Sequence, residues 1–285
     1  MIRVSELSFT YPGAEGPAVR DFDFEVQPGE VLGLLGPSGA GKSTTQNILI
    51  GLLKGYQGQV EVMGKEMKAW GAEFFERVGV SFELPNHYLK LTARENLDYF
   101  RAMYNGPTET AETVLEQVGL LDAIDTHVSD YSKGMKQRLT LARSMLNQPK
   151  LWFLDEPTSG LDPVNARNVM DIVKERREQG TTVLLTTHNM MVADELCDRV
   201  GFVVDGKLVT LDSPKQLKLA HGKRSVKVED RGEDGALHCE EMELDGLGQN
   251  ADFLSLLNEQ HVETIHSQET TLEGVFIAVT GRALS

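Results

Sequence analysis

The stretch Gly36-Pro37-Ser38-Gly39-Ala40-Gly41-Lys42-Ser43-Thr44 decides the fold of this chain. It follows an apolar run, Val31–Leu35, which has the composition of a parallel strand buried on both faces. It leads into Thr45–Ile50, which we interpret as the start of a helix. A strand, a glycine-rich loop ending in Gly-Lys-Ser and a helix, in that order, are the context of a phosphate-binding loop.

Each part of the loop has a chemical task in that interpretation. Glycines allow consecutive backbone N–H groups to curl around a phosphate, and the helix N-terminus adds positive potential. Lys42 would reach the outer phosphates, and the hydroxyl of Ser43 would bind Mg²⁺. The alternative is an ordinary glycine-rich turn between two core elements. The strand and the helix on either side favour phosphate binding.

Composition limits the class of protein. The chain has 285 residues, enough for one large domain with a small annex, and a formal net charge of −15. Such a charge disfavours broad binding to nucleic acid or anionic lipid, whereas nucleotide binding is local. Cys197 and Cys239 lack metal-ligand spacing, which favours a reduced, intracellular protein. There is no signal segment and no apolar run of about 20 residues, so a membrane function needs spans from another chain.

The order of patterns predicts an α/β core interrupted by a helical insert. Two alternating segments, residues 2–10 and 22–26, predict a small antiparallel sheet beside the main sheet. Helical spacing occupies residues 92–148, and the core resumes with the strand Leu151–Leu154. Further strands are expected at residues 58–63, 78–82, 181–186, 200–204 and 207–211, and helices after Asp162 and Asn189.

Beyond a linker at His221–Arg224, the pattern predicts a small α+β domain. From Lys223 onward there are five basic and thirteen acidic residues, a net charge of −8, and no catalytic pattern. We therefore expect an ATPase-sized domain at residues 1–220 and a small accessory domain at residues 223–285. The expected elements of the latter are strands around Val226–Val228 and Leu237–Leu244, a helix at 252–258, a strand at 262–265 and a helix at 272–279.

Asp155 and Glu156 directly follow the strand Leu151–Leu154. With a phosphate-binding loop upstream, the end of this strand places two carboxylates beside the phosphates. Asp155 would hold Mg²⁺, directly or through water, and Glu156 would polarise the attacking water. The alternative is a pair of solvated acids at a strand end, and the upstream loop favours the catalytic interpretation.

A second anion site is expected within Tyr131–Arg138. Ser132 and Gly134 lie at the N-terminus of the third helix of the insert, where backbone N–H groups and the helix dipole attract anions. Because the loop at Gly36–Thr44 already holds one nucleotide, a second site on a separate insert suits a nucleotide bound to another subunit. Alternatively, Ser132 is an ordinary helix N-cap.

Taken together, these segments resemble the ATP-binding subunit of an ABC transporter. Gly36–Thr44 resembles the Walker A motif, Leu151–Glu156 the Walker B motif, and Ser132–Gln137 the signature loop. Ser159–Asp162 resembles the D-loop, and His188 the switch histidine. The resemblance covers residues 1 to about 220, and the motifs stand in the order and at the intervals of the family.

The resemblance implies a fold, ligands and partners. The fold would be an α/β P-loop NTPase cassette with a mixed core sheet, an antiparallel β subdomain and a helical subdomain at about residues 84–148. The ligands would be ATP and Mg²⁺, with ATP hydrolysed. Two cassettes, as a homodimer or a pair, would associate head to tail on a separate transmembrane permease. The chain would be cytoplasmic and peripheral on the inner face of the cell membrane, with no nucleic-acid partner.

Three more residues gain roles from the resemblance. Tyr11 matches the aromatic residue that stacks on adenine, although a turn tyrosine packed on the sheet is the alternative. His188 would contact the γ-phosphate, and the alternative is a cap for the helix after Asn189. Asp162, followed by Pro163, has the form of a helix N-cap and would also touch the partner subunit.

Glu83 departs from the family pattern. In the family, the helical subdomain usually starts at a glutamine that reaches Mg²⁺ and the attacking water, and Glu83 stands in its place. A carboxylate can contact the metal but repels the γ-phosphate. Glu83 is therefore a candidate metal ligand whose charge distinguishes this chain.

The C-terminal segment Glu269–Phe276, with Thr280-Gly281-Arg282, resembles one branch of the family. That branch includes drug-resistance, sodium-extrusion and lipid or polysaccharide exporters with separate membrane subunits. The leading hypothesis is thus an ATPase that powers export. One alternative is a soluble ABC-type mechanical ATPase of DNA repair or translation, which the acidity disfavours. Another is a regulatory module without turnover, which Asp155, Glu156 and His188 disfavour. The transported substrate is not encoded in these motifs.

Overall fold

The computed structural model describes residues 1–222, 225–231, 236–259, 261–268 and 270–282. The chain divides into two compact units, Met1–Ser213 and Pro214–Leu284. Helix α7 (Pro214–His221), which the sequence analysis did not predict, is thus counted with the second unit, whereas the expected first domain extended to residue 220. The division into domains at residues 1–220 and 223–285 stays a prediction.

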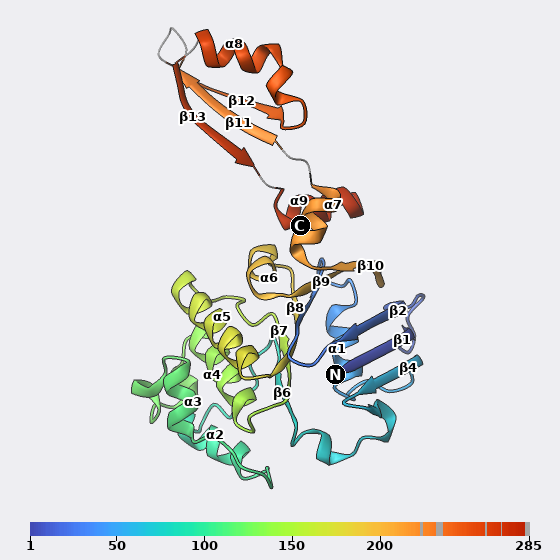
Figure 1. Cartoon of the computed structure of the whole chain (residues 1–285). Coiled ribbons are helices and arrows are strands. Elements are labelled where there is room, and N and C mark those ends of the chain that lie inside the picture. Colours follow the sequence, from blue (N-terminus) through green and yellow to red (C-terminus); the bar gives the residue numbers. More distant parts are fainter. Residues whose placement is uncertain (223–224, 232–235, 260, 269, 283–285) are drawn as a thin grey trace. The chain divides into compact units, whose positions relative to one another are not determined.

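A six-stranded sheet forms the centre of the first unit (Figure 1). Its order is β10-β9-β3-β8-β7-β6, and every neighbouring pair is parallel except β10 with β9. All residues of β3 (Val31–Leu35) are buried, which confirms the strand expected before the phosphate loop. The carboxyl ends of the parallel strands meet at one edge, where ligands bind in sheets of this kind. The other strands are β6 (Val78–Ser81), β7 (Leu151–Asp155), β8 (Thr182–Thr187), β9 (Arg199–Val204) and β10 (Lys207–Asp212).

The small antiparallel sheet is confirmed, with the order β2-β1-β4-β5. Alternation along β2 (Val19–Val26) buries Phe22, Phe24 and Val26 in the core between the layers. The strand β5 was not expected, because two residues carry no periodicity. The other strands are β1 (Ile2–Phe9), β4 (Gln57–Val62) and β5 (Lys65–Glu66).

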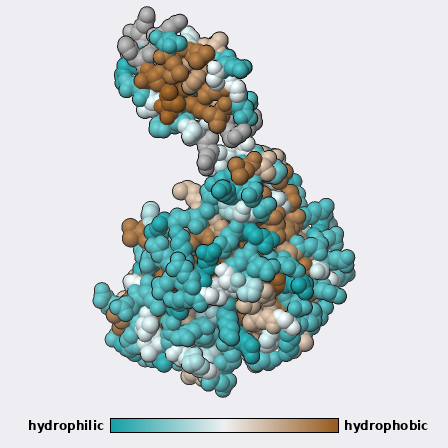
Figure 2. All heavy atoms as spheres, viewed as in Figure 1, coloured by the Kyte–Doolittle hydropathy of each residue, from teal (hydrophilic) through white to brown (hydrophobic). Residues whose placement is uncertain are grey.

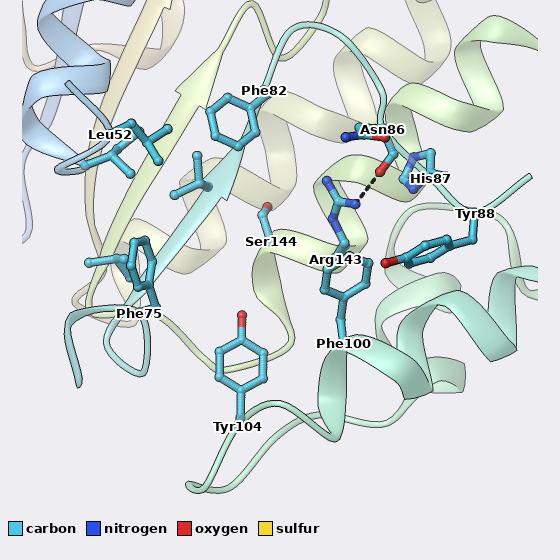
Figure 3. Close-up of a pocket in the computed structure, with 13 residues that line it drawn as sticks. Leu52, Phe75, Phe82, Asn86, His87, Tyr88, Phe100, Tyr104, Arg143 and Ser144 are labelled. Carbon is cyan, nitrogen blue, oxygen red and sulfur yellow. Dashed lines mark hydrogen bonds between the residues drawn. The ribbon is translucent and has the colours of Figure 1, made fainter. Parts of the chain in front are cut away.

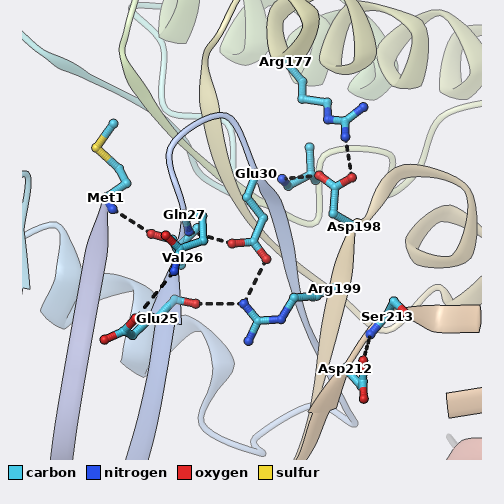
Figure 4. Close-up of polar contacts among 11 residues, drawn as sticks. Met1, Glu25, Val26, Gln27, Glu30, Arg177, Asp198, Arg199, Asp212 and Ser213 are labelled. Carbon is cyan, nitrogen blue, oxygen red and sulfur yellow. Dashed lines mark hydrogen bonds and ion pairs between the residues drawn. The ribbon is translucent and has the colours of Figure 1, made fainter. Parts of the chain in front are cut away.

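An ion pair between Arg199 and the buried Glu30 ties the antiparallel sheet to the core sheet (Figure 4). Nη1 of Arg199 donates to the Glu25 carbonyl oxygen at 3.2 Å and to Oε1 of Glu30 at 3.1 Å. The other oxygen of Glu30 accepts a hydrogen bond from the Gln27 backbone N–H at 2.6 Å. Glu30 is buried, and these partners compensate its charge. The contacts fix the turn between β2 and β3, and hence the start of the strand that leads to the phosphate loop.

Two helices of the core begin at the N-caps that the sequence predicts. The Asp162 carboxylate accepts from the N–H groups of Val164 and Asn165, both at 3.1 Å, and the Asn189 side chain caps α6 in the same way. None of the helices described by the structure has the length and apolar character that a bilayer crossing requires. The helices are α1 (Lys42–Leu49), α5 (Pro163–Glu178) and α6 (Met190–Leu196).

The helical insert is confirmed and lies to one side of the core sheet, drawn in green in Figure 1. Its first helix starts at the expected capping box, in which Thr92 and Glu95 bond to each other's backbone N–H. The insert helices are α2 (Ala93–Arg101), α3 (Ala111–Gln117) and α4 (Lys133–Met145). Short 3-10 helices occur at Met67–Ala69, Ala72–Phe74, Leu121–Ala123, Val128–Asp130 and, in the second unit, Leu247–Gln249.

The second unit contains a three-stranded antiparallel sheet of order β12-β11-β13, as the alternating segments predict. Figure 2 shows an apolar patch on this acidic unit. The exposed large apolar side chains of the unit include Leu254, Leu257 and Ile265. Helices α7 and α9 contact each other. Part of the expected linker, residues 223–224, lies outside the described residues. The elements are β11 (Ser225–Arg231), β12 (Leu237–Glu243), α8 (Ala251–Glu259), β13 (His261–Gln268) and α9 (Leu272–Thr280).

Candidate active site

The phosphate loop connects β3 to α1, which begins at Lys42. Gly36 has a φ of +158° and Gly41 a φ of +110°. A Cβ at Gly36 would lie 2.0 Å from the Val203 carbonyl oxygen, and one at Gly41 would lie 2.5 Å from the Ala18 carbonyl oxygen. Both positions therefore require glycine, because neighbouring backbone presses against the loop.

Lys42 spans the loop from inside. Its Nζ donates hydrogen bonds to the carbonyl oxygens of Gly36 at 2.7 Å and Pro37 at 3.0 Å. The side chain is buried, and this burial lowers the pKa of the ammonium group, while the nearby carboxylates of Glu156, Asp155 and Glu83 act in the opposite direction. The ammonium thus lies at the loop, where Ser38 and Gly39 form the exposed tip and Ala40 is buried.

Ser43 and Asp155 meet beneath the loop. Ser43 Oγ donates to Asp155 Oδ1 at 3.2 Å, and the Thr186 hydroxyl donates to the same oxygen. Burial raises the pKa of Asp155, and the two hydrogen bonds oppose that rise. A hydroxyl and a carboxylate are oxygen ligands of the kind that Mg²⁺ prefers, usually together with substrate phosphates. Among the described residues, the structure contains no group of three or more His, Cys, Asp and Glu side chains that could hold a metal ion.

Glu156 is held in one orientation. It has a φ of +48° and is 7% exposed. Oε1 accepts hydrogen bonds from the backbone N–H of His188 at 2.9 Å and from its Nδ1 at 2.7 Å, and Oε2 accepts from the Thr187 hydroxyl at 3.0 Å. A buried carboxylate fixed beside an exposed histidine is suited to accept a proton from water.

Thr186 and Thr187 were missed by sequence reasoning. They end β8, which pairs in parallel with β7 so that Asp155 lies opposite Thr186. Each threonine bonds one of the two acidic residues. The available signal was the pair of hydroxyl residues at the end of the strand that precedes His188.

Tyr11 lies at the phosphate loop. Its hydroxyl is 3.1 Å from Thr44 Oγ1, and its ring meets the Phe9 ring edge-on with centroids 4.9 Å apart. The side chain is 40% exposed. Tyr11 thus packs on the end of β1 and presents open ring surface beside the loop, and its stacking on adenine stays a prediction.

Ser132 caps α4, because its Oγ accepts from the Met135 N–H at 3.2 Å. Gly134 lies beside the D-loop segment, where an added Cβ would be 3.5 Å from the Leu161 side chain and 3.8 Å from the Gly160 carbonyl oxygen. Within the described residues of this chain, no hydrogen bond joins Ser132 or Gly134 to the phosphate loop. The structure thus brings together Lys42, Ser43, Asp155, Glu156 and His188, and leaves the signature loop apart from this network.

A pocket of about 590 Å³ lies between the core and the helical insert (Figure 3). Phe75, Phe82 and Phe100 are among its apolar lining residues. Arg143 also lines it, donating from Nη1 to the Asn86 carbonyl oxygen at 2.6 Å, with its guanidinium 4.6 Å from the centroid of the Phe100 ring. Burial lowers the pKa of Arg143. The pocket therefore offers an apolar surface with one partly buried cation.

His87, in the wall of this pocket, should make the fold sensitive to acid. Burial, with the charges of Arg143 and Lys136, lowers the pKa of His87 to about 4, although its hydrogen bond to the Lys136 carbonyl oxygen opposes the shift. Because the folded pKa lies below the unfolded one, this contribution to stability is present at neutral pH and is lost as pH falls through the window between them. We expect a loss of about 2 kcal/mol between pH 7 and pH 4 that His87→Gln lacks. Urea unfolding at several pH values measures it, and parallel curves for the two proteins would contradict it.

A phosphate-binding loop after β3 of a mixed sheet, two carboxylates at the end of β7 and a capped helix on an insert define an ATP-binding cassette. Residues 19–159 match the family model described as ABC transporter, and residues 224–269 match a second model described as fluoroquinolone efflux ABC transporter C-terminal domain. The chain is 56% identical over its whole length to a fluoroquinolones export ATP-binding protein of Mycobacterium tuberculosis, covering 95% of that protein. It is 35% identical to the Nod factor export ATP-binding protein I of Neorhizobium galegae, over 89% of this chain and 70% of that one.

Among solved structures, the fold is similar to a dimeric ATP-binding cassette in a post-hydrolysis state, bound to ADP and Pi. The TM-score is 0.68 at 27% identity, over 75% of this chain and 98% of the other. The chain belongs to the ABC transporter family, and within it this protein is an ATP-binding subunit with ATPase activity.

Proposed function

We propose that this chain hydrolyses ATP to drive the export of fluoroquinolone antibiotics through a separate permease. The proposed substrate class rests on the similarity to the fluoroquinolones export protein. This similarity extends over the full length of the chain and includes the acidic C-terminal segment. A general ATPase would need only the first unit. Similarity that extends across residues 224–269 ties the chain to one kind of exporter.

The roles of the site residues follow from their contacts. Lys42 and the backbone N–H groups of the loop residues after Pro37 bind the outer phosphates. Ser43 and Asp155 would hold Mg²⁺, which neutralises charge on the phosphates when bound. Glu156 accepts a proton from a water molecule while the oxygen of that water attacks the γ-phosphorus. The bond between the γ-phosphorus and the oxygen that bridges it to the β-phosphate breaks, and ADP leaves with the electron pair.

His188 and Tyr11 position the substrate in this proposal. His188 holds Glu156 by two hydrogen bonds and faces the solvent side, where the γ-phosphate would lie. Tyr11 is anchored to Thr44 and offers ring surface for stacking on adenine, a contact of about 1–3 kcal/mol.

Two cassettes would pair head to tail, as a homodimer or with a related chain. Ser132 and Gly134 of one copy would then cap the ATP held by Lys42 of the other. The N-terminus of α4, which Ser132 caps, supports this arrangement, because helix N-termini attract anions. The dimeric state of the solved cassette also supports it.

The permease would dock at the pocket around Arg143, and the chain would then lie on the inner face of the cell membrane. The apolar lining and the exposed Leu52 and Phe75 at its edge support this site, because exposed apolar surface marks interaction sites. Residues 223–285 would form the accessory domain, with the ATPase domain at 1–220.

Transport in inside-out vesicles tests the proposed substrate. Vesicles that contain the chain and the permease that co-purifies with it should accumulate a fluorescent fluoroquinolone when ATP is added. The Glu156→Gln variant should abolish accumulation, because transport depends on turnover. ATP hydrolysis in these vesicles without drug accumulation would contradict the substrate class and leave the ATPase intact.

A further inference from the structure

Glu83 follows the strand next to the one that carries Asp155, and both strands end at the same edge of the core sheet. Ser81, the last residue of β6, lies opposite Leu154 of β7. Glu83 comes two residues after Ser81, and Glu156 comes two residues after Leu154. Both residues therefore follow their strands at the same edge of the sheet. A third carboxylate therefore leaves the sheet next to Asp155 and Glu156.

The charges at this edge are unequal. Burial lowers the pKa of the Lys42 ammonium, and three carboxylates oppose this shift by their negative charge, those of Glu156, Asp155 and Glu83. Asp155 and Glu156 are buried and held by threonine and histidine donors. Glu83 is exposed and, within the described part of the chain, makes no hydrogen bond or ion pair. It is thus the acidic group of the three whose charge is free to act on an incoming ligand.

We propose that Glu83 determines the specificity of the site for the metal complex of ATP over the free nucleotide. This inference rests on the proposed function, in which Lys42 and the loop bind the triphosphate. Free ATP brings its full negative charge to an edge that already carries three carboxylates, so Glu83 repels it. A divalent cation on the phosphates reduces that repulsion and offers Glu83 an attractive partner. An amide at this position could still offer its oxygen to the cation, but it would lack the negative charge that repels free ATP and strengthens the attraction to the cation.

The substitution Glu83→Gln removes the charge and keeps the shape. Equilibrium binding of ATP is measured by calorimetry twice, in excess EDTA and in saturating Mg²⁺. In EDTA the affinity of Glu83→Gln should rise about fivefold over the unsubstituted protein, as expected for a partly solvated charge. In Mg²⁺ it should be unchanged or weaker. The ratio of the two dissociation constants should therefore fall about fivefold or more, and high salt should shrink the difference.

Two matched variants make the result specific. Glu178→Gln removes the same charge from the exposed end of α5, away from this edge, and should leave the ratio unchanged. Glu83→Asp keeps the charge and should largely keep the ratio. If Glu83→Gln changes the dissociation constant of ATP equally in EDTA and in Mg²⁺, or in neither, the role of Glu83 is overturned. The proposed function would survive that result, because ATP still binds. Absence of ATP binding by the unsubstituted protein in either condition would instead overturn the proposed function.

Discussion

Replacing Glu156 by glutamine should slow ATP hydrolysis by about 10²–10⁴-fold, the usual contribution of a general base, while ATP still binds. Glutamine is nearly isosteric with glutamate, and its carbonyl oxygen can still accept the His188 N–H at the place of Oε1. What it loses is the ability to take a proton from water. ATP should therefore remain intact in the closed pair of cassettes, and the pair should persist.

Phosphate release measures the rate of ATP hydrolysis, and light scattering measures whether the two cassettes stay paired. With Mg²⁺ and ATP, the Glu156→Gln protein should elute as a dimer with negligible phosphate release, whereas the unsubstituted protein returns to monomer as ATP is consumed. The Glu178→Gln protein, which loses the same charge from α5, should turn over normally. Unimpaired turnover by Glu156→Gln would remove Glu156 from its role as base.

The elements that carry the site were predictable because their signals are local. An apolar run before a glycine loop predicted β3, and the Asp162-Pro163 and Thr92–Glu95 pairs predicted helix starts that the structure confirms. The three-stranded sheet of the second unit also followed from the alternation along its strands. Helix α7 was missed, because its eight residues are short for a periodic signal.

The finer geometry of the site depends on contacts between distant segments. Thr186 reaches Asp155 only because β8 pairs with β7 in one register. The need for glycine at Gly36 comes from Val203, 167 positions along the chain, whose carbonyl oxygen presses on the loop. The positive φ of Glu156 likewise has no local signal, since glutamate rarely adopts it. Sequence patterns name such residues, whereas tertiary packing sets their orientation.

Replacing Lys42 by alanine should weaken ATP binding by about 10–100-fold, as expected for the loss of hydrogen bonds between charged groups. Nζ now bonds to the Gly36 and Pro37 carbonyl oxygens, so the cation is already at the loop before a phosphate arrives. Without it, the carboxylates of Asp155 and Glu156 face the triphosphate with no opposing charge from residue 42. Repulsion then adds to the lost bonds, and the effect should exceed that of any single loop hydroxyl.

Calorimetry with Mg²⁺ and ATP gives the affinity of Lys42→Ala, and thermal unfolding shows whether the variant is folded. A cooperative transition close to that of the unsubstituted protein would assign the lost affinity to the missing ammonium and not to a damaged loop. Lys207→Ala, on the exposed strand β10, removes the same charge elsewhere and should bind ATP normally. Because Lys42 is the cation that the geometry places inside the loop, ATP binding of unchanged strength in folded Lys42→Ala would mean that the backbone N–H groups alone hold the phosphates. The phosphate-binding role of Lys42 would then be wrong, whatever the result of the Glu156→Gln experiment.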